Sequence, residues 1–134
     1  MSVEYLDLAG CIAIATAVTG HELQTVMNMT NHDLADSALH APVIGVGDTD
    51  FSPEFIDKAA VLVVRLARNH PLPDGNKLAA WVSLRLFVDI NDWTWTPAPT
   101  IEEAEVAVLA IAAGEWDEAA AARWLQQHLR PPTS

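Results

Sequence analysis

The residues whose types and spacing could do chemistry lie in one short segment, from His70 to Lys77. His70 is the nearby titratable group suited to act as a general base near neutral pH. Asp74 offers a hard oxygen ligand of the kind that Mg²⁺ accepts together with phosphates and water. Gly75 allows a phosphate to approach the backbone closely, Asn76 adds a neutral amide donor, and Lys77 adds a positive charge. Phosphoryl-group chemistry needs these parts.

Two helices are expected to position this segment. Residues 52–54 combine a hydroxyl cap, a proline and an acid, which predicts a helix start, and the helix should run to about Arg68. Pro71 prevents its continuation and pushes His70 out of helical geometry. A second helix is expected over residues 77–90, and its first backbone N–H groups would point toward a bound anion. The same residues also suit an ordinary helix–loop–helix turn, so spacing alone leaves both interpretations open.

The rest of the chain predicts more helices and little strand. Helices are expected over Tyr5 to Val18, Asn28 or Asn31 to Leu39, Thr100 to Ala113, and Asp117 to Leu129. The Trp93-Thr94-Trp95 alternation suits a short extended piece, and residues 42–48 indicate a loop or flap-like strand. The expected fold is mainly α: a compact bundle of about six helices with a short β flap. It forms a single domain over residues 1–134, with 130–134 as a tail.

Composition excludes several classes of function. The formal net charge of −11 argues against broad affinity for nucleic acid or anionic lipid. The one cysteine, Cys11, leaves no internal disulfide and no cysteine-based zinc site. The five tryptophans come without a basic groove, which favours core packing over base stacking. No stretch is long enough to span a bilayer and no basic region opens a signal peptide, so we expect a cytoplasmic protein.

The segment from Ala67 to Lys77 resembles the signature of the Fic family, histidine-x-phenylalanine-x-acid-glycine-asparagine. It has the Doc-like form, in which the asparagine is followed by lysine. Residues 33–42, 58–62 and 112–115 are similar to further Doc segments in the same order. The resemblance covers most of residues 31–129.

The resemblance implies a role for each residue of the segment. His70 corresponds to the general base that takes the proton from a target hydroxyl, and Asp74 to the acid that binds Mg²⁺. The residues that correspond to the phosphate-binding positions are Gly75, Asn76 and Lys77. The flap that aligns the target by strand-like pairing corresponds to Val43, Ile44, Gly45 and Val46.

The resemblance also implies an activity. Doc-like (death-on-curing) proteins are toxins of type II toxin–antitoxin pairs. They act as kinases that pass the terminal phosphate of ATP to a threonine of elongation factor Tu, which arrests translation. The implied cofactors are therefore ATP and Mg²⁺. The implied partners are elongation factor Tu and a cognate antitoxin, with no direct nucleic acid and no membrane.

One departure from the family pattern keeps two alternatives open. Leu78 stands where the family usually has an arginine that helps to hold phosphates, and losing one such contact costs about 1.5–3 kcal/mol. Arg65, Arg68 or Arg85 could compensate. The alternatives are a Fic-type AMP transferase, against which Lys77 argues, and a catalytically weakened Fic-fold binding protein. The inhibitory motif of self-restrained Fic proteins is absent, so restraint is expected from another chain.

Overall fold

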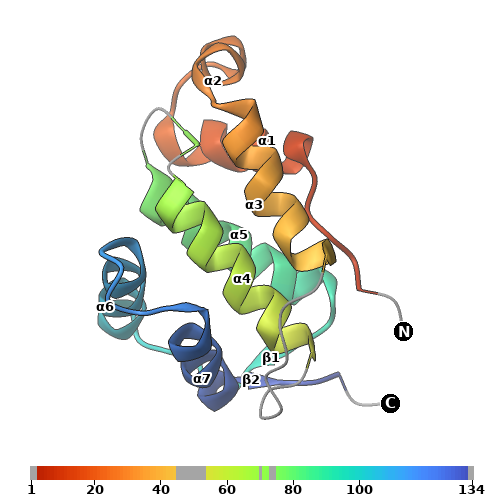
Figure 1. The fold of residues 1–134 in the computed structure, drawn as a ribbon, viewed down its shortest axis with the longest axis vertical. Helices are drawn as coiled ribbons and strands as arrows, with labels where there is room; N and C mark the ends of the chain where they lie inside the picture. The colour runs from red at the N-terminus through yellow and green to blue at the C-terminus, as the bar shows by residue number, and fades with distance from the viewer. Residues whose placement is uncertain (1–2, 45–53, 70, 73–74, 133–134) are drawn as a thin grey trace.

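The structure, a computed structural model, describes residues 3–44, 54–69, 71–72 and 75–132. These residues form seven helices and one two-stranded antiparallel sheet (Figure 1). The elements are α1 (Leu8–Thr19), α2 (Leu23–Met29), α3 (His32–Ile44), α4 (Glu54–Asn69), α5 (Asn76–Ile90), β1 (Thr94–Trp95), α6 (Ile101–Ala112), α7 (Glu118–His128) and β2 (Leu129–Arg130). The expected mainly α fold is confirmed, with seven described helices in place of about six.

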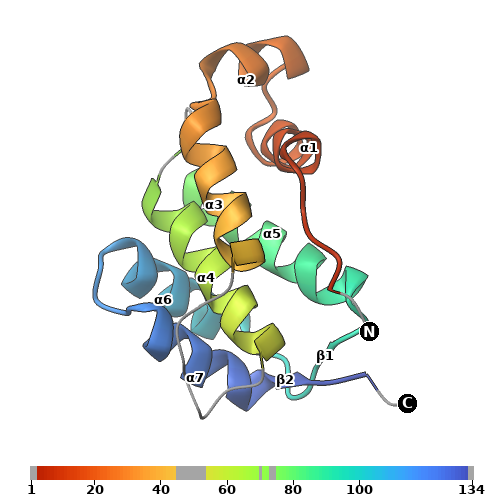
Figure 2. The same cartoon turned by 45° about the vertical axis from the view of Figure 1, so that its right-hand side comes forward.

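Helix α4 is the centre of the bundle. It packs against α3, α5, α6 and α7 (Figure 2), and most of its side chains are buried on every side. Such all-round burial is usual for a central helix. Phe55 of α4 stacks on Phe87 of α5 with ring centroids 4.9 Å apart, a geometry that adds about 0.5–1.5 kcal/mol to simple burial. The two helices that carry the ends of the chemistry-bearing segment are therefore packed directly together.

The helix boundaries follow local capping signals. The Asp7 side chain caps α1, so this helix begins three residues later than the expected Tyr5. It ends at Thr19, and its C-cap residue Gly20 takes the left-handed conformation. The caps expected at Thr100 and Asp117 are confirmed, because both side chains accept the expected backbone bonds. Helix α2 was not expected, and its N-cap residue makes no side-chain capping bond.

Helix α3 extends further than the sequence predicts. It was expected to end at Leu39, before Pro42, but it continues through Pro42 to Ile44. Proline removes one N–H donor from the helix. The carbonyl oxygen of Pro42 accepts a hydrogen bond from a side chain of α4. The Lys58 ammonium, which is buried, donates to the Pro42 carbonyl oxygen at 2.7 Å. The part of the expected flap that includes Val43 therefore belongs to a helix.

The residues that directly follow α7 form part of the small sheet. Thr94 pairs with Arg130 and Trp95 with Leu129 in the antiparallel sheet. The extended piece expected around residue 94 is confirmed. Arg130, the first residue of the expected tail, lies in β2, and α7 ends at His128, one residue earlier than expected.

The side chains of the core confirm the expectation for the tryptophans. The tryptophans are partly buried and pack against the main core, as expected. Cys11 is 2% exposed, and burial raises the pKa of its thiol above the ordinary value. Of the helices that the structure describes, none is both long enough and apolar enough to cross a bilayer.

Candidate active site

The structure describes part of the chemistry-bearing segment. Gly75, Asn76 and Lys77 are described, whereas His70 and Asp74 lie outside the described residues. The roles expected for His70 as a base and Asp74 as a magnesium ligand stay predictions. In the expected flap, Gly45 and Val46 also lie outside the described residues, and Val43 and Ile44 are the last residues of α3.

The loop between α4 and α5 is held by the junction of α2 and α3. The backbone N–H of Asn31 donates to the Pro71 carbonyl oxygen at 2.7 Å. The Asn31 side chain also caps α3 by accepting from the Leu34 N–H at 3.0 Å. At the end of α4, directly before the loop, the Asn69 amide donates to the Leu34 carbonyl oxygen at 3.3 Å. The amino-terminal helices therefore fix where the loop begins.

The Asn76 side chain closes the loop on itself. Its oxygen accepts from the Leu72 N–H at 3.0 Å, and its amide nitrogen donates to the Leu72 carbonyl oxygen at 3.1 Å. We expected this amide to act as a donor toward phosphate, and the structure uses one of its two hydrogens for Leu72 instead. The structural role of Asn76 is therefore to set the loop geometry. Its phosphate contact stays a prediction.

Gly75 is required by the shape of the turn into α5. Its φ is +70°, in the left-handed region, and it is the N-cap of α5. A Cβ atom at this position would lie 3.1 Å from Thr19 Cγ2 and 3.2 Å from Val18 Cγ1. The end of α1 thus packs closely on the turn. No described side chain caps α5, so the first N–H groups of this helix suit the binding of an anion.

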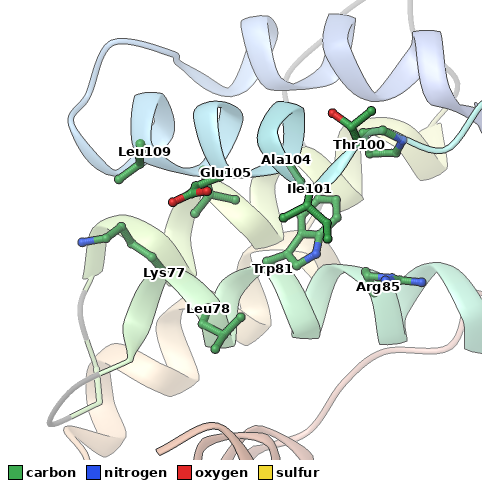
Figure 3. A pocket seen from close by; sticks show the side chains of 11 residues that line it. Lys77, Leu78, Trp81, Arg85, Thr100, Ile101, Ala104, Glu105 and Leu109 are labelled. Carbon is green, nitrogen blue, oxygen red and sulfur yellow. The ribbon is translucent and has the colours of Figure 1, made fainter.

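A pocket of about 390 Å³ opens between α5 and α6, beside this turn. Lys77 and Arg85 lie toward opposite ends of it, with Trp81 between them (Figure 3). Much of the remaining wall is apolar. The lining residues are Lys77, Leu78, Trp81, Arg85, Pro99, Thr100, Ile101, Ala104, Glu105, Val108 and Leu109. Because Lys77 belongs to both features, the pocket is continuous with the amino-terminal end of α5.

Two of the three arginines considered as substitutes for the family arginine have structural roles. Arg65 pairs with Glu118 of α7 at 3.1 Å. Arg68 donates to the carbonyl oxygens of Ile111, at 3.1 Å, and Trp116. These contacts hold α7 and the turn before it against α4. Arg85 is different, because it lines the pocket and forms no hydrogen bond or ion pair with any residue that the structure describes.

The pocket itself was not predicted from the sequence. Trp81, which we expected to pack in the core with the other tryptophans, lines the pocket together with Glu105. The sequence of α6 contained one signal for a surface pocket: apolar residues occur on most sides of this helix, although it lies at the surface. The structure leaves three of them in solvent: Ile101 is 84% exposed, Val106 63% and Leu109 49%. Ile101 and Leu109 line the pocket.

Comparisons with known proteins identify the family to which the chain belongs. Residues 11–88, more than half of the chain, match the Fic/DOC family, and the protein belongs to this family. It is similar to the protein named Toxin Doc from Mycolicibacterium smegmatis, with 33% identity over 114 residues, which cover 85% of each chain. The resemblance to the Doc-like branch of the family is therefore confirmed.

Proposed function

We propose that this protein is a Doc-like toxin that transfers the terminal phosphate of ATP to a threonine hydroxyl of a translation factor. From the resemblance of residues 67–77 to Doc-like toxins, the proposed target is elongation factor Tu and the proposed consequence is arrest of translation. A cognate antitoxin is the proposed source of restraint.

The observation that carries the proposal is the continuity between the start of α5 and the pocket. Gly75 takes the left-handed conformation at the start of the helix, where uncapped N–H groups favour phosphate. Lys77 then extends from the first turn into the lining of the pocket. The pocket volume of about 390 Å³ is in the usual range for small-molecule sites, about 300–1,000 Å³. A nucleotide has the matching form, with an anionic tail joined to an aromatic body.

The proposed reaction assigns one task to each polar residue of the loop. The target hydroxyl oxygen attacks the terminal phosphorus, and the hydroxyl proton passes to a ring nitrogen of His70. The bond between that phosphorus and the bridging oxygen breaks, and ADP leaves. Lys77 and the amide N–H groups after Gly75 stabilise the phosphate charge. Asn76 acts as a positioning residue through its two bonds to Leu72.

The residues present fit a magnesium ion that arrives with the nucleotide. The described residues contain no group of three acidic, histidine or cysteine side chains that could hold a metal. Mg²⁺ is commonly bound by one or two carboxylates together with substrate phosphates and water. Asp74 would supply the protein carboxylate. When bound, Mg²⁺ would neutralise part of the phosphate charge.

Side chains of the pocket bear on the two alternative functions: Lys77 disfavours AMP transfer, and Leu78 favours a weakened binding protein. AMP transfer requires the nucleotide in the opposite orientation, and the Lys77 side chain occupies space that the usual second glycine leaves open. A weakened binding protein is favoured by Leu78, which is 53% exposed in the pocket wall and presents no charge to a ligand. Kinase activity is preferred because Lys77 supplies a cation at the proposed phosphate site.

Labelled ATP separates these functions. Purified protein is incubated with elongation factor Tu, Mg²⁺ and ATP labelled on either the γ- or the α-phosphate. Transfer of the γ-label alone supports the kinase, and transfer of the α-label supports AMP transfer instead. His70→Ala and Asp74→Asn should abolish transfer, whereas His40→Ala, at an exposed histidine of α3, should preserve it. Transfer of neither label by soluble protein would refute both enzymatic functions.

A growth experiment tests the biological role. Expression of the wild-type chain should arrest growth and add one phosphate group to elongation factor Tu, as measured by intact mass. Both effects should disappear in the His70→Ala variant. Co-expression with the product of the adjacent reading frame should restore growth if that product is the antitoxin. Normal growth with unmodified factor and soluble toxin would contradict the proposed target.

A further inference from the structure

Two of the chain's seven lysines and arginines line the pocket between α5 and α6. They are Lys77 and Arg85. Four others bond to the protein itself: Lys58, Arg65, Arg68 and Arg130. Arg123 is exposed on α7 and does not line the pocket. Glu105 adds one carboxylate to the lining, so the pocket has two cations against one anion. On a protein with a net charge of −11, this local excess of positive charge favours an occupant with electron-rich groups.

The two cations are separated along the length of the pocket. Arg85 follows Lys77 by eight residues on α5, which corresponds to about 12 Å along the helix axis. Lys77 lies beside the amino-terminal turn, whereas Arg85 lies across from Thr100 and Ile101 at the start of α6 (Figure 3). Neither cation forms a hydrogen bond or an ion pair with any residue that the structure describes. Both guanidinium and ammonium donors are thus available to a ligand.

The wall between the cations suits a flat apolar body. Leu78, Trp81 and Val108 contribute apolar surface there, and an indole offers a face on which a base can stack. A nucleotide bound with its phosphates near Lys77 would extend its ribose and base along this wall. Its far edge would then reach the end of the pocket that Arg85 occupies. Arginine carries hydrogen-bond donors and no acceptor, so it would bind acceptor atoms of the base or ribose.

We propose that Arg85 is a nucleotide-binding residue that holds the base and ribose end, and that it recovers part of the binding lost with the arginine that Leu78 replaces. The inference rests on the proposed function, because it takes the phosphates to lie at the start of α5. An apolar segment of a partner protein is the competing occupant of the same wall. The nucleotide is favoured because the pocket begins at Lys77, beside the proposed phosphate site.

Calorimetric titration with parts of the nucleotide tests the assignment. The probes are the non-hydrolysable ATP analogue with an imido group between the β- and γ-phosphates, inorganic tripolyphosphate, and adenosine, the first two with Mg²⁺. Arg85→Ala should weaken the analogue and adenosine about tenfold or more, as expected for a bond from a charged group. It should leave tripolyphosphate within about twofold. Lys77→Ala should instead weaken the analogue and tripolyphosphate, and leave adenosine unchanged.

Two further variants sharpen the comparison. Arg123→Ala removes an exposed arginine from α7, outside the pocket, and should leave all three probes unchanged. Arg85→Lys keeps the charge but loses the planar arrangement of donors, so affinity for the analogue should be intermediate. Because Arg85 is exposed, its variants should fold, and matching melting temperatures would verify this.

The possible results distinguish the inference from the proposed function. If the wild-type protein binds the analogue and Arg85→Ala binds it equally well, the inference is wrong and the proposed function stands. If Arg85→Ala weakens the binding of tripolyphosphate as much as that of the analogue, the nucleotide binds with its phosphates toward Arg85. This result also overturns the inference. If the wild type binds neither the analogue nor tripolyphosphate, both the inference and the proposed function fail. An apolar segment of a partner protein is then the preferred occupant of the pocket.

Discussion

Replacing Asn76 by alanine should destabilise the protein, because this side chain holds the loop between α4 and α5. The variant loses two hydrogen bonds, at 3.0 and 3.1 Å, between the side chain and the backbone of Leu72. A hydrogen bond contributes about 0.5–1.5 kcal/mol net, and an unsatisfied buried partner adds to the loss. Leu72 is 6% exposed, but both bonds are only partly buried, so we expect a total of about 2 kcal/mol.

Urea unfolding measures this loss directly. With a denaturant dependence of about 2 kcal/mol per molar urea, as is typical of small proteins, the unfolding midpoint should fall by about 1 M. The matched control is Asn28→Ala, at an exposed asparagine of α2, which should change the free energy of unfolding by less than about 0.5 kcal/mol. If Asn76→Ala were as stable as this control, the two bonds to Leu72 would not hold the loop, and the reasoning would be refuted.

Three further predictions concern the same region and α6. Gly75→Ala should cost at least about 1–2 kcal/mol because of its positive φ, with an added cost from crowding against Thr19; an unchanged melting temperature would contradict the turn geometry. Leu78→Arg should raise affinity for the ATP analogue about 10- to 100-fold, and calorimetry showing less than about a threefold gain would mean that the added guanidinium does not reach phosphate. Hydrogen bonds from Thr100 lower the pKa of the Glu103 carboxyl in the folded protein. The ionised Glu103 therefore stabilises the fold at pH values above the ordinary glutamate pKa of about 4.3. This stabilisation is lost as the pH falls through the lower pKa that Glu103 has in the folded protein. Urea unfolding should therefore show wild type and Glu103→Gln converging at acid pH, and a constant difference between pH 7 and 3 would oppose this account.

Local signals in the sequence predicted the elements around the loop well. The capping pattern at Thr100 places the start of α6 correctly, and Pro71 separates α4 from α5 as expected. These signals work because a capping side chain or a proline acts within one turn of its own position. The resemblance in residues 67–77 then identified the family, which the comparisons confirm.

The features that the sequence did not predict depend on contacts between distant segments. Asn31 and Pro71 are forty positions apart, and their bond becomes visible only once α2 and α3 are placed beside the loop. The extension of α3 past Pro42 is accompanied by a contact from Lys58 of the neighbouring helix. The pocket likewise needs the relative placement of α5 and α6. A pattern confined to one element carries no information on such pairings.

The burial of Cys11 makes the protein a convenient scaffold for site-specific labelling. Its thiol is 2% exposed, and its raised pKa keeps it protonated near neutral pH, so it reacts slowly with thiol-directed reagents. A second cysteine introduced at an exposed position such as Val106, on α6 but outside the pocket lining, would therefore be modified selectively in the folded protein. A fluorophore attached there could report on nucleotide, target and antitoxin in one preparation, without removing the native thiol.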